Sequence, residues 1–329
     1  MDERRLRLVW IAVAALALVA LTLSVTRKKR ALYMVVKGAE GFGDRLQCLL
    51  QAIRYARKSD RRLVVDWRDD HWCHDGATGF DEYFELVGIS SASFAELKGA
   101  IDDGEAIAPA RWTPDVVCEP TRVSELYAYD EFVDAPSTAR CVVHPGVKFR
   151  AWHCADASSV RARPWLAERV LRAFEAMPGK YTAVHLRGGD RLARLVAEHR
   201  TTRRAYVEEM RAKAGPGPVV IVSDDAGLVQ EYERQCVAAG TQRPRLSGLT
   251  PPAKCVDGAA GTHLNGAGSL QCPFLTKREL NANAVCDFVV LSHADRVVAD
   301  GNSLFSRMAQ CVAYPAFGIR TRDSRDPKP

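Results

Sequence analysis

The residues best suited to chemistry in this chain lie in one short segment, where His185, Arg187 and Asp190 follow the pattern H-x-R-x-x-D. An arginine in such a segment suits a diphosphate, because its guanidinium is planar, permanently charged and able to hold two oxygens at once. Gly188 and Gly189 allow the backbone to turn sharply or to approach a ligand closely. The alternative is an ordinary surface turn in which Arg187 pairs with Asp190, since short motifs also occur by chance.

A buried strand is expected to position this segment. Residues 181–186 form a short apolar, β-branched run that ends where the polar residues begin, which is typical of a buried strand. In open α/β sheets, ligands bind beyond the carboxyl ends of the strands. The sequence therefore predicts that His185 and Arg187 lie at a ligand-binding edge.

The chain on both sides of this segment alternates strands and helices, with a capping box at Thr276 and Glu279 that marks one helix start. In the second half we expect strands at 181–186, 219–224 and 296–299, and helices at 202–214, 226–239, 276–292 and 304–313. The strand at 219–224 ends in two acids. Residues 240–272 are rich in Gly and Pro without periodicity, which predicts a functional or mobile loop.

The first half shows the same order, although its pattern weakens after residue 67. We expect strands at 33–37, 63–66 and 141–144, and helices at 44–58, near 80–87 and at 164–177. Two successive β/α halves predict an α/β fold with two Rossmann-like domains facing a cleft. Their expected bounds are residues 33–178 and 179–320, followed by a polar tail at 321–329.

The N-terminal segment favours a membrane anchor. Residues 8–25 are 18 residues without a charge, between a short tail (1–7) with three basic residues and a linker (26–32) with four. This run is just long enough to span a bilayer as a helix. It is long for a signal peptide and lacks a small-residue cleavage site, so we expect an uncleaved transmembrane helix. The flanking charges do not decide its orientation.

Charge and cysteine content exclude several classes of protein. Residues 31–329 contain 39 Lys and Arg against 38 Asp and Glu, so a nucleic-acid-binding surface is not indicated. None of the ten cysteines forms a C-x-x-C pair, which argues against zinc ribbons and thioredoxin-like motifs. Cys255 and Cys272 bracket a Gly-rich loop and could form a disulfide in an oxidising lumen. Most of the others are equally compatible with buried free thiols.

A cluster at residues 71–75 contains two histidines, a cysteine and an aspartate but lacks the spacing of a metal site. We interpret it as part of a loop that lines the cleft. Trp67 and Trp72 are then available to stack on a ligand, or they belong to the core.

The turn after the first strand permits a second interpretation. Gly41 and Gly43 follow a strand and open a helix, and Asp66 comes 23 residues after Gly43, as in a dinucleotide-binding fingerprint. The third glycine position is occupied by Leu46. An NAD(P)-dependent oxidoreductase is therefore an alternative.

Three blocks of sequence, residues 40–46, 185–190 and 287–303, together resemble the fucosyltransferases that share an H-x-R-x-x-D motif. That group includes the α1,6-fucosyltransferases, the nodulation enzymes among them, and the protein O-fucosyltransferases. The resemblance implies a GT-B fold and an inverting transfer of fucose from GDP-fucose to a glycan or protein hydroxyl, without a metal cofactor. It also implies a type II membrane protein with a lumenal catalytic domain in the Golgi or another secretory compartment. On this basis residues 33–178 form the acceptor side and residues 179–320 the nucleotide side. The loop at 71–75 would then line the acceptor side, where Trp67 and Trp72 could stack on sugar if they are not part of the core.

The resemblance further implies roles for single residues. Arg187 matches the arginine that holds the β-phosphate of the leaving GDP, where a preorganised cation stabilises the transition state. Glu40 matches the glutamate that deprotonates the acceptor in protein O-fucosyltransferases. Asp287 matches a carboxylate that recognises guanine, and Ser303 a hydroxyl on the phosphates. The other donor-binding residues that it implies are Gly41, Gly43, Asp44, His185, Asp190 and Arg191.

One position departs from the family pattern. The α1,6 enzymes carry a second arginine directly after the first, and this chain has Gly188 there. Arg191 is the candidate for a compensating charge. The linkage (α1,6, α1,2 or O-linked to protein) therefore stays open, and a catalytically silent GDP-sugar-binding protein is a further alternative.

Overall fold

The computed structural model describes residues 31–38, 40–69, 71–73, 79–102, 104, 106–110, 112–120, 137–144, 154–175, 177–198, 200–246, 276–301, 303–312 and 315–320. The predicted transmembrane segment at 8–25, the Cys255–Cys272 pair and the tail at 321–329 lie outside these residues. No helix in the described part is long and apolar enough to cross a membrane.

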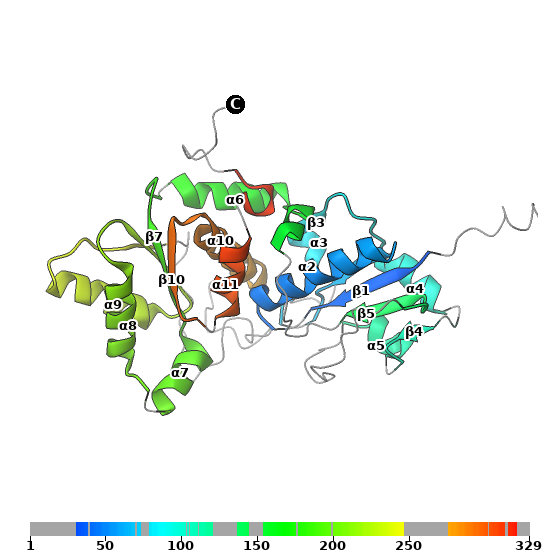
Figure 1. The fold of residues 1–329 in the computed structure, drawn as a ribbon, viewed down its shortest axis with the longest axis horizontal. Coiled ribbons are helices and arrows are strands. Elements are labelled where there is room, and N and C mark those ends of the chain that lie inside the picture. Colours follow the sequence, from blue (N-terminus) through cyan, green and yellow to red (C-terminus); the bar gives the residue numbers. More distant parts are fainter. Residues whose placement is uncertain are drawn as a thin grey trace, which may run out of the picture. The chain divides into compact units, whose positions relative to one another are not determined.

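The first sheet contains four parallel strands in the order β2-β1-β5-β4 (Figure 1). Its strands are β1 (Tyr33–Lys37), β2 (Arg62–Asp66), β4 (Ile107–Ala108) and β5 (Cys141–His144). The helix α2 (Phe42–Lys58) connects β1 to β2 and packs on both. All residues of β1 are buried, which explains why its sequence is a continuous run rather than an alternating pattern.

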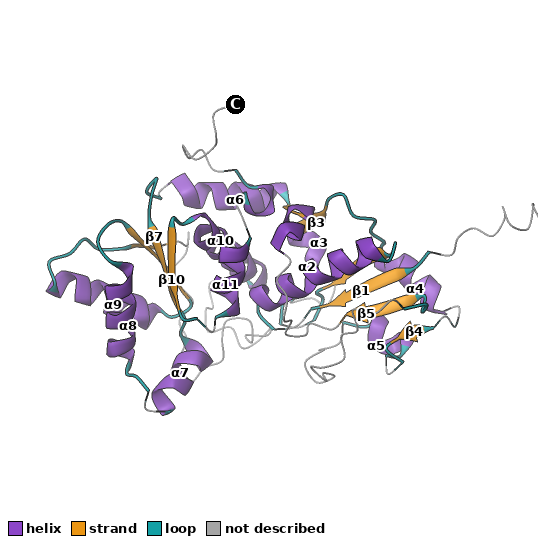
Figure 2. Ribbon diagram, viewed as in Figure 1, coloured by secondary structure: helices purple, strands orange, loops and turns teal. Residues whose placement is uncertain are grey.

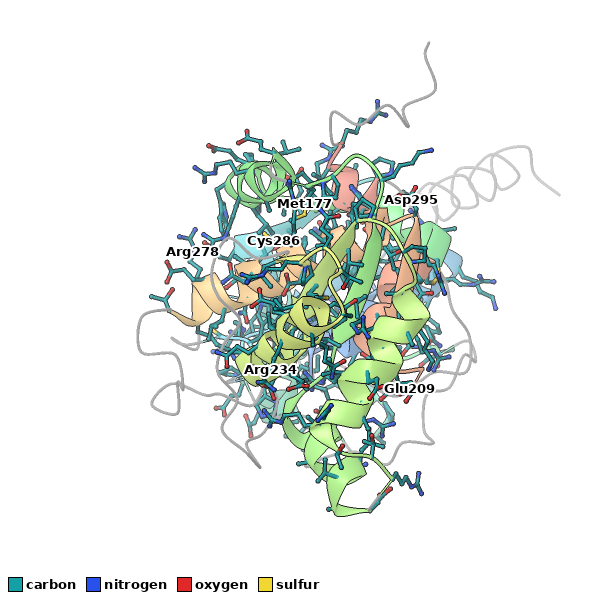
Figure 3. All side chains as sticks on the ribbon, turned by 90° about the vertical axis from the view of Figure 1, so that its left-hand side faces the viewer. Met177, Glu209, Arg234, Arg278, Cys286 and Asp295 are labelled. Carbon is teal, nitrogen blue, oxygen red and sulfur yellow. A yellow bond between two sulfur atoms is a disulfide. The ribbon has the colours of Figure 1, made fainter. Side chains whose placement is uncertain are left out.

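The second sheet is also parallel, in the order β10-β7-β8-β9. Its strands are β7 (Thr182–Leu186), β8 (Val219–Ser223), β9 (Arg245–Leu246) and β10 (Arg296–Ala299). Helices α8 (Arg203–Ala214) and α9 (Ala226–Ala238) cover one face, and α10 (Lys277–His293) and α11 (Leu304–Cys311) cover the other (Figures 1 and 2). Figure 3 shows Glu209 and Arg234 pointing outward from α8 and α9. The predicted α/β fold with parallel sheets is confirmed.

Shorter elements complete the described part of the chain. They are α3 (Phe80–Tyr83), β3 (Phe84–Leu86), α4 (Phe94–Asp102), α5 (Pro114–Cys118), η2 (Cys154–Ser159), β6 (Val160–Ala162), α6 (Pro164–Glu175), α7 (Gly189–Ala197) and η4 (Ala316–Gly318). The helix expected near 80–87 is wrong in its second half, because β3 pairs there with β6 in an antiparallel ladder. The division into two domains near residue 178 stays a prediction.

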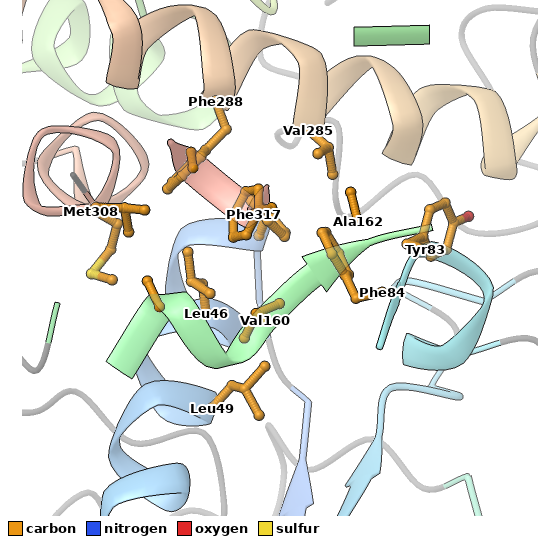
Figure 4. Close-up of a cluster of buried hydrophobic side chains, with 14 of the residues drawn as sticks. Leu46, Leu49, Tyr83, Phe84, Val160, Ala162, Val285, Phe288, Met308 and Phe317 are labelled. Atoms are coloured by element: carbon orange, nitrogen blue, oxygen red, sulfur yellow. The ribbon is translucent and has the colours of Figure 1, made fainter. Parts of the chain in front are cut away.

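One hydrophobic cluster joins elements from both halves of the sequence. Figure 4 shows side chains of α2, β6, α10, α11 and η4 packed together. Phe42 lies among several aromatic rings of this cluster, with its centroid 5.1 Å from Phe288 and stacked 5.7 Å from Trp72. Burial of a phenylalanine typically stabilises a fold by about 1.5–3 kcal/mol. The phenylalanine of the Glu40–Asp44 turn therefore anchors this turn in the core.

A disulfide joins Cys154 in η2 to Cys311 at the end of α11, with Cα atoms 5.5 Å apart. It closes a loop with a sequence separation of 157 residues, so it strongly restricts the unfolded chain. We expect Cys311→Ser to lower the free energy of unfolding by ~2–5 kcal/mol in urea titrations. Reductant should destabilise the wild-type protein but not this variant. Cys118 offers a control, because it takes no part in this disulfide and Cys118→Ser should therefore keep the response to reductant.

Candidate active site

The carboxyl ends of three strands meet at one edge of the second sheet. His185 on β7 is in register with Ala299 on β10 and with Val222 on β8. The residues that follow these strands therefore lie together, and they include Arg187 after β7, Asp224 after β8 and Asp300 after β10. The predicted position of His185 and Arg187 at the carboxyl end of a buried strand is confirmed.

Arg187 is held by groups from two neighbouring elements. Its Nη1 forms an ion pair with Asp224, whose other carboxylate oxygen accepts a hydrogen bond from the N–H of Gly188 at 2.7 Å. The backbone N–H of Arg187 donates to the hydroxyl of Tyr206 on α8 at 3.2 Å. The Arg187 side chain is 23% exposed, so a ligand can still reach the guanidinium. The arrangement presents a cation whose orientation is fixed before a ligand binds.

His185 contributes a neutral group to this edge. Burial lowers the pKa of His185 to about 4, although the nearby charge of Asp224 acts in the opposite direction. Its Nδ1 lies 3.4 Å from the hydroxyl oxygen of Ser303. Ser303 precedes α11, and its side chain makes no capping hydrogen bond to that helix. The N-terminus of α11 thus carries a hydroxyl at a place where helix dipoles favour anions.

A second helix begins at the same edge. The helix α7 starts at Gly189, directly after the strand and turn that carry the motif, and Asp190 lies in its first turn. Arg191 Nε donates to Asp300 at 2.8 Å, and this hydrogen bond raises the pKa of Arg191 further above its ordinary value. The ion pair ties α7 to the end of β10. Two helix N-termini and two arginines therefore converge where a diphosphate would find donors and positive charge.

Gly188 is required by close packing. A Cβ atom at this position would lie 2.4 Å from the Cβ of Asp225. Asp225 is itself fixed, because it caps α9 and accepts hydrogen bonds from the N–H groups of Gly227 and Leu228 at 2.8 and 3.2 Å. The side chain of Asp225 thus occupies the space that a second arginine would need to leave the backbone.

The first block of the sequence reaches this edge through helix packing. Gly41 precedes α2 as its N-cap, and Asp44 lies in the first turn. A Cβ on Gly43 would lie 2.8 Å from the backbone of Phe305 on α11, and the ring of Phe305 lies 5.5 Å from that of His185. Glu40 immediately precedes this helix start and has a φ of 57°. The block therefore lies close to the residues at the carboxyl end of β7, His185 among them.

Two predictions are decided by burial. Asp66, the acid of the dinucleotide-binding fingerprint in the oxidoreductase interpretation, is 3% exposed and bound by Lys37 at 2.6 Å and by Arg68 at 2.8 Å. Burial alone would raise the pKa of Asp66, but its hydrogen bonds and ion pairs with these cations lower it. Trp67 and Trp72 are buried in the core, which was the alternative to sugar stacking. The geometry does not favour a dinucleotide site at Gly41 and Gly43.

Asp287, the predicted guanine-binding residue, is carried by helix α10 rather than by the end of a strand. It lies half-buried on α10, one turn before Val290, whose carbonyl accepts a hydrogen bond from Tyr181 at 2.8 Å. The contacts described for His185 and Ser303 do not include it. Its role stays a prediction. Within the described residues, no group of three or more potential ligands is arranged for a metal ion.

Comparisons with solved structures show a related architecture. The fucosyltransferase NodZ from Bradyrhizobium has a TM-score of 0.56 and 19% identity, over 86% of this chain and 93% of that protein. The fold is that of solved fucosyltransferases. POFUT1 in complex with GDP has a TM-score of 0.52 and 12% identity, over 89% of this chain and 97% of that protein. No protein-family model and no curated protein matches the sequence. The α/β architecture that the resemblance implied is confirmed.

The sequence analysis did not identify the acidic residues that contact the H-x-R-x-x-D segment and its neighbours. Asp224, Asp225 and Asp300 each follow a strand and contact a motif residue, its backbone or a neighbouring cation. The signal that could have found them is shared by all three, because each is an acid at or directly after the carboxyl end of a predicted strand. In a parallel sheet such positions lie at one edge.

Proposed function

We propose that this protein transfers fucose from GDP-fucose to a hydroxyl group of a glycan or protein. The observation that carries the proposal is the convergence of Arg187, His185, Ser303 and two helix N-termini at the carboxyl edge of the second sheet. The fold supports it, because similar structures are the α1,6-fucosyltransferase NodZ soaked with GDP-fucose and POFUT1 in complex with GDP-fucose.

In this mechanism Arg187 binds the diphosphate and stabilises the charge that develops as GDP leaves. Asp224 keeps the guanidinium oriented and so reduces the reorganisation that the transition state requires. Glu40 takes the proton of the acceptor hydroxyl, which attacks the sugar from the face opposite to GDP and inverts the anomeric centre. No step in this scheme uses a metal ion, since the arginine and the helix N-termini meet the charge of the diphosphate.

The proposal includes a secretory location. Residues 8–25 would anchor the protein as a type II membrane protein, with the catalytic part in the lumen of the Golgi or a related compartment. The Cys154–Cys311 disulfide supports an oxidising compartment. Protease protection of residues 31–329 in sealed vesicles tests this location, and digestion by external protease would contradict it.

A second candidate is a GDP-sugar-binding protein without transfer activity. It is favoured by Gly188, because Asp225 fills the space where the α1,6 enzymes have a second arginine. Isothermal titration with GDP and with NAD, followed by an assay of GDP release from GDP-fucose, separates the candidates. A transferase should bind GDP and release it from GDP-fucose, whereas a silent binding protein should bind GDP without releasing it from GDP-fucose. Binding of NAD without binding of GDP would contradict both candidates.

Asp287 gives a test of nucleotide specificity. We expect Asp287→Asn to weaken GDP binding roughly tenfold or more, because an amide donor would then face the N–H groups of guanine, a mismatch that costs ~1–3 kcal/mol. UDP affinity should hardly change. Titration calorimetry with both nucleotides measures the difference, and an equal loss for GDP and UDP would make Asp287 a structural residue.

A further inference from the structure

A buried arginine contacts the turn that carries Glu40. Arg45 lies near the start of α2 and is completely buried. Its Nε donates to the carbonyl oxygen of Glu40 at 3.0 Å. Its Nη1 and Nη2 donate to the two carboxylate oxygens of Asp69 at 2.7 and 2.5 Å. All three guanidinium nitrogens of Arg45 are thus used, and one of them is directed at the Glu40 backbone.

The surroundings of Arg45 accommodate this side chain closely. The guanidinium carbon lies 5.9 Å from the ring centroid of Trp67 and 5.5 Å from that of Trp72. A Cβ on Gly38 would lie 1.9 Å from Nη1, so only glycine leaves the necessary space there. The two buried tryptophans and this glycine therefore form a compartment around the Arg45–Asp69 pair.

The backbone of Glu40 needs such support. Its φ of 57° lies in the left-handed region, which disfavours residues that have a Cβ. A conformation of this kind persists only where the surrounding structure determines it. The hydrogen bond from Arg45 fixes the carbonyl of Glu40 and so fixes the peptide plane that follows it. Because this plane and φ together set the direction of the Cα–Cβ bond, the hydrogen bond from Arg45 helps to fix the direction in which the Glu40 side chain leaves the backbone.

We propose that Arg45 is a positioning residue for Glu40, which it holds in the orientation that deprotonates the acceptor. A buried ion pair alone is weak evidence for a role in stability, because the cost of removing both charges from water offsets their attraction. The contact with the strained residue gives Arg45 a specific task instead. The inference rests on the proposed function, in which Glu40 is the base.

A double-mutant cycle, in which variants of Arg45 are combined with Glu40→Gln and kcat is measured for each, tests the proposal. Arg45→Lys keeps the charge but cannot bind Asp69 through two nitrogens and also reach the Glu40 carbonyl. Arg45→Met with Asp69→Asn removes the ion pair as a whole, which proteins tolerate better than an unpaired buried charge. We expect each to lower kcat for transfer roughly 10- to 100-fold, because small misplacements of a catalytic group have effects of this size. GDP affinity should stay within about twofold of wild type.

The decisive comparison uses the background Glu40→Gln, in which neither Arg45 variant should reduce kcat further. Arg61→Lys is the matched control, because Arg61 is another buried arginine that donates to carbonyls, including that of Tyr33 at the far end of β1. It should leave kcat unchanged in both backgrounds. If the Arg45 variants lower kcat by the same factor in Glu40→Gln as in wild type, or if both of them lose GDP binding, the positioning role is wrong but the proposed function stands. Absence of transfer by the wild-type protein would overturn the proposed function and this inference with it.

Discussion

Replacing Arg187 with lysine should reduce fucosyl transfer almost as strongly as replacing it with alanine. Negative charge develops on GDP as its bond to fucose breaks, and a preorganised cation there stabilises the transition state more than the bound donor. Lysine keeps the charge but lacks the planar fork that pairs with Asp224 and can hold two oxygens at once. We expect both variants to lose ~10²–10³ in kcat.

The measurement is GDP release from GDP-fucose with a panel of glycan and peptide acceptors, with and without EDTA. Arg194 offers the matched control, because it is exposed on the same helix α7, and Arg194→Lys should keep the wild-type rate. EDTA should leave the wild-type rate intact. An Arg187→Lys variant that retains most activity would remove Arg187 from the catalytic role. A wild-type rate that EDTA abolishes and manganese restores would indicate a metal-dependent transferase.

The position of Arg187 in the fold follows from local sequence. A buried parallel strand is a short apolar run, and residues 181–186 end this run directly before Arg187, as the end of β7 at Leu186 confirms. The start of α10 is equally local. Thr276 and Glu279 make both reciprocal hydrogen bonds of the capping box that their spacing predicts. Patterns that operate within one element can therefore be recognised without the structure.

The partners of the motif could not be predicted in the same way. Asp224 meets Arg187 across 37 positions of the chain, and Asp300 meets Arg191 across 109. Only the order and register of the strands bring these residues together, and no local pattern encodes strand order. The packing around Gly43 could not be predicted for the same reason. The sequence shows only that Gly43 fits part of a dinucleotide-binding fingerprint, and the structure adds that its lack of a side chain lets α2 approach the backbone of Phe305.

The second large effect is expected at Glu40, where Glu40→Gln should abolish most transfer and leave GDP binding intact. Glutamine has nearly the same size but cannot take a proton from the acceptor, and a general base typically contributes ~10²–10⁴ in rate. The hydrogen bond from Arg45 reaches the backbone carbonyl, so the substitution leaves the turn in place. The loss should therefore appear in kcat rather than in the affinity for GDP, measured by transfer kinetics and titration calorimetry.

Two further variants isolate the role of the Glu40 carboxylate. In Glu40→Ala, added formate should restore part of the transfer rate, because a small carboxylate can enter the space that the side chain leaves, whereas Glu40→Gln should not respond. Asp44→Asn changes the acid in the first turn of α2 and should weaken GDP binding more than it lowers kcat. Equal losses of kcat and GDP affinity in Glu40→Gln would instead make Glu40 part of the donor site. An unchanged kcat would assign the base to a different group, and Arg45 would then have no catalytic side chain to position.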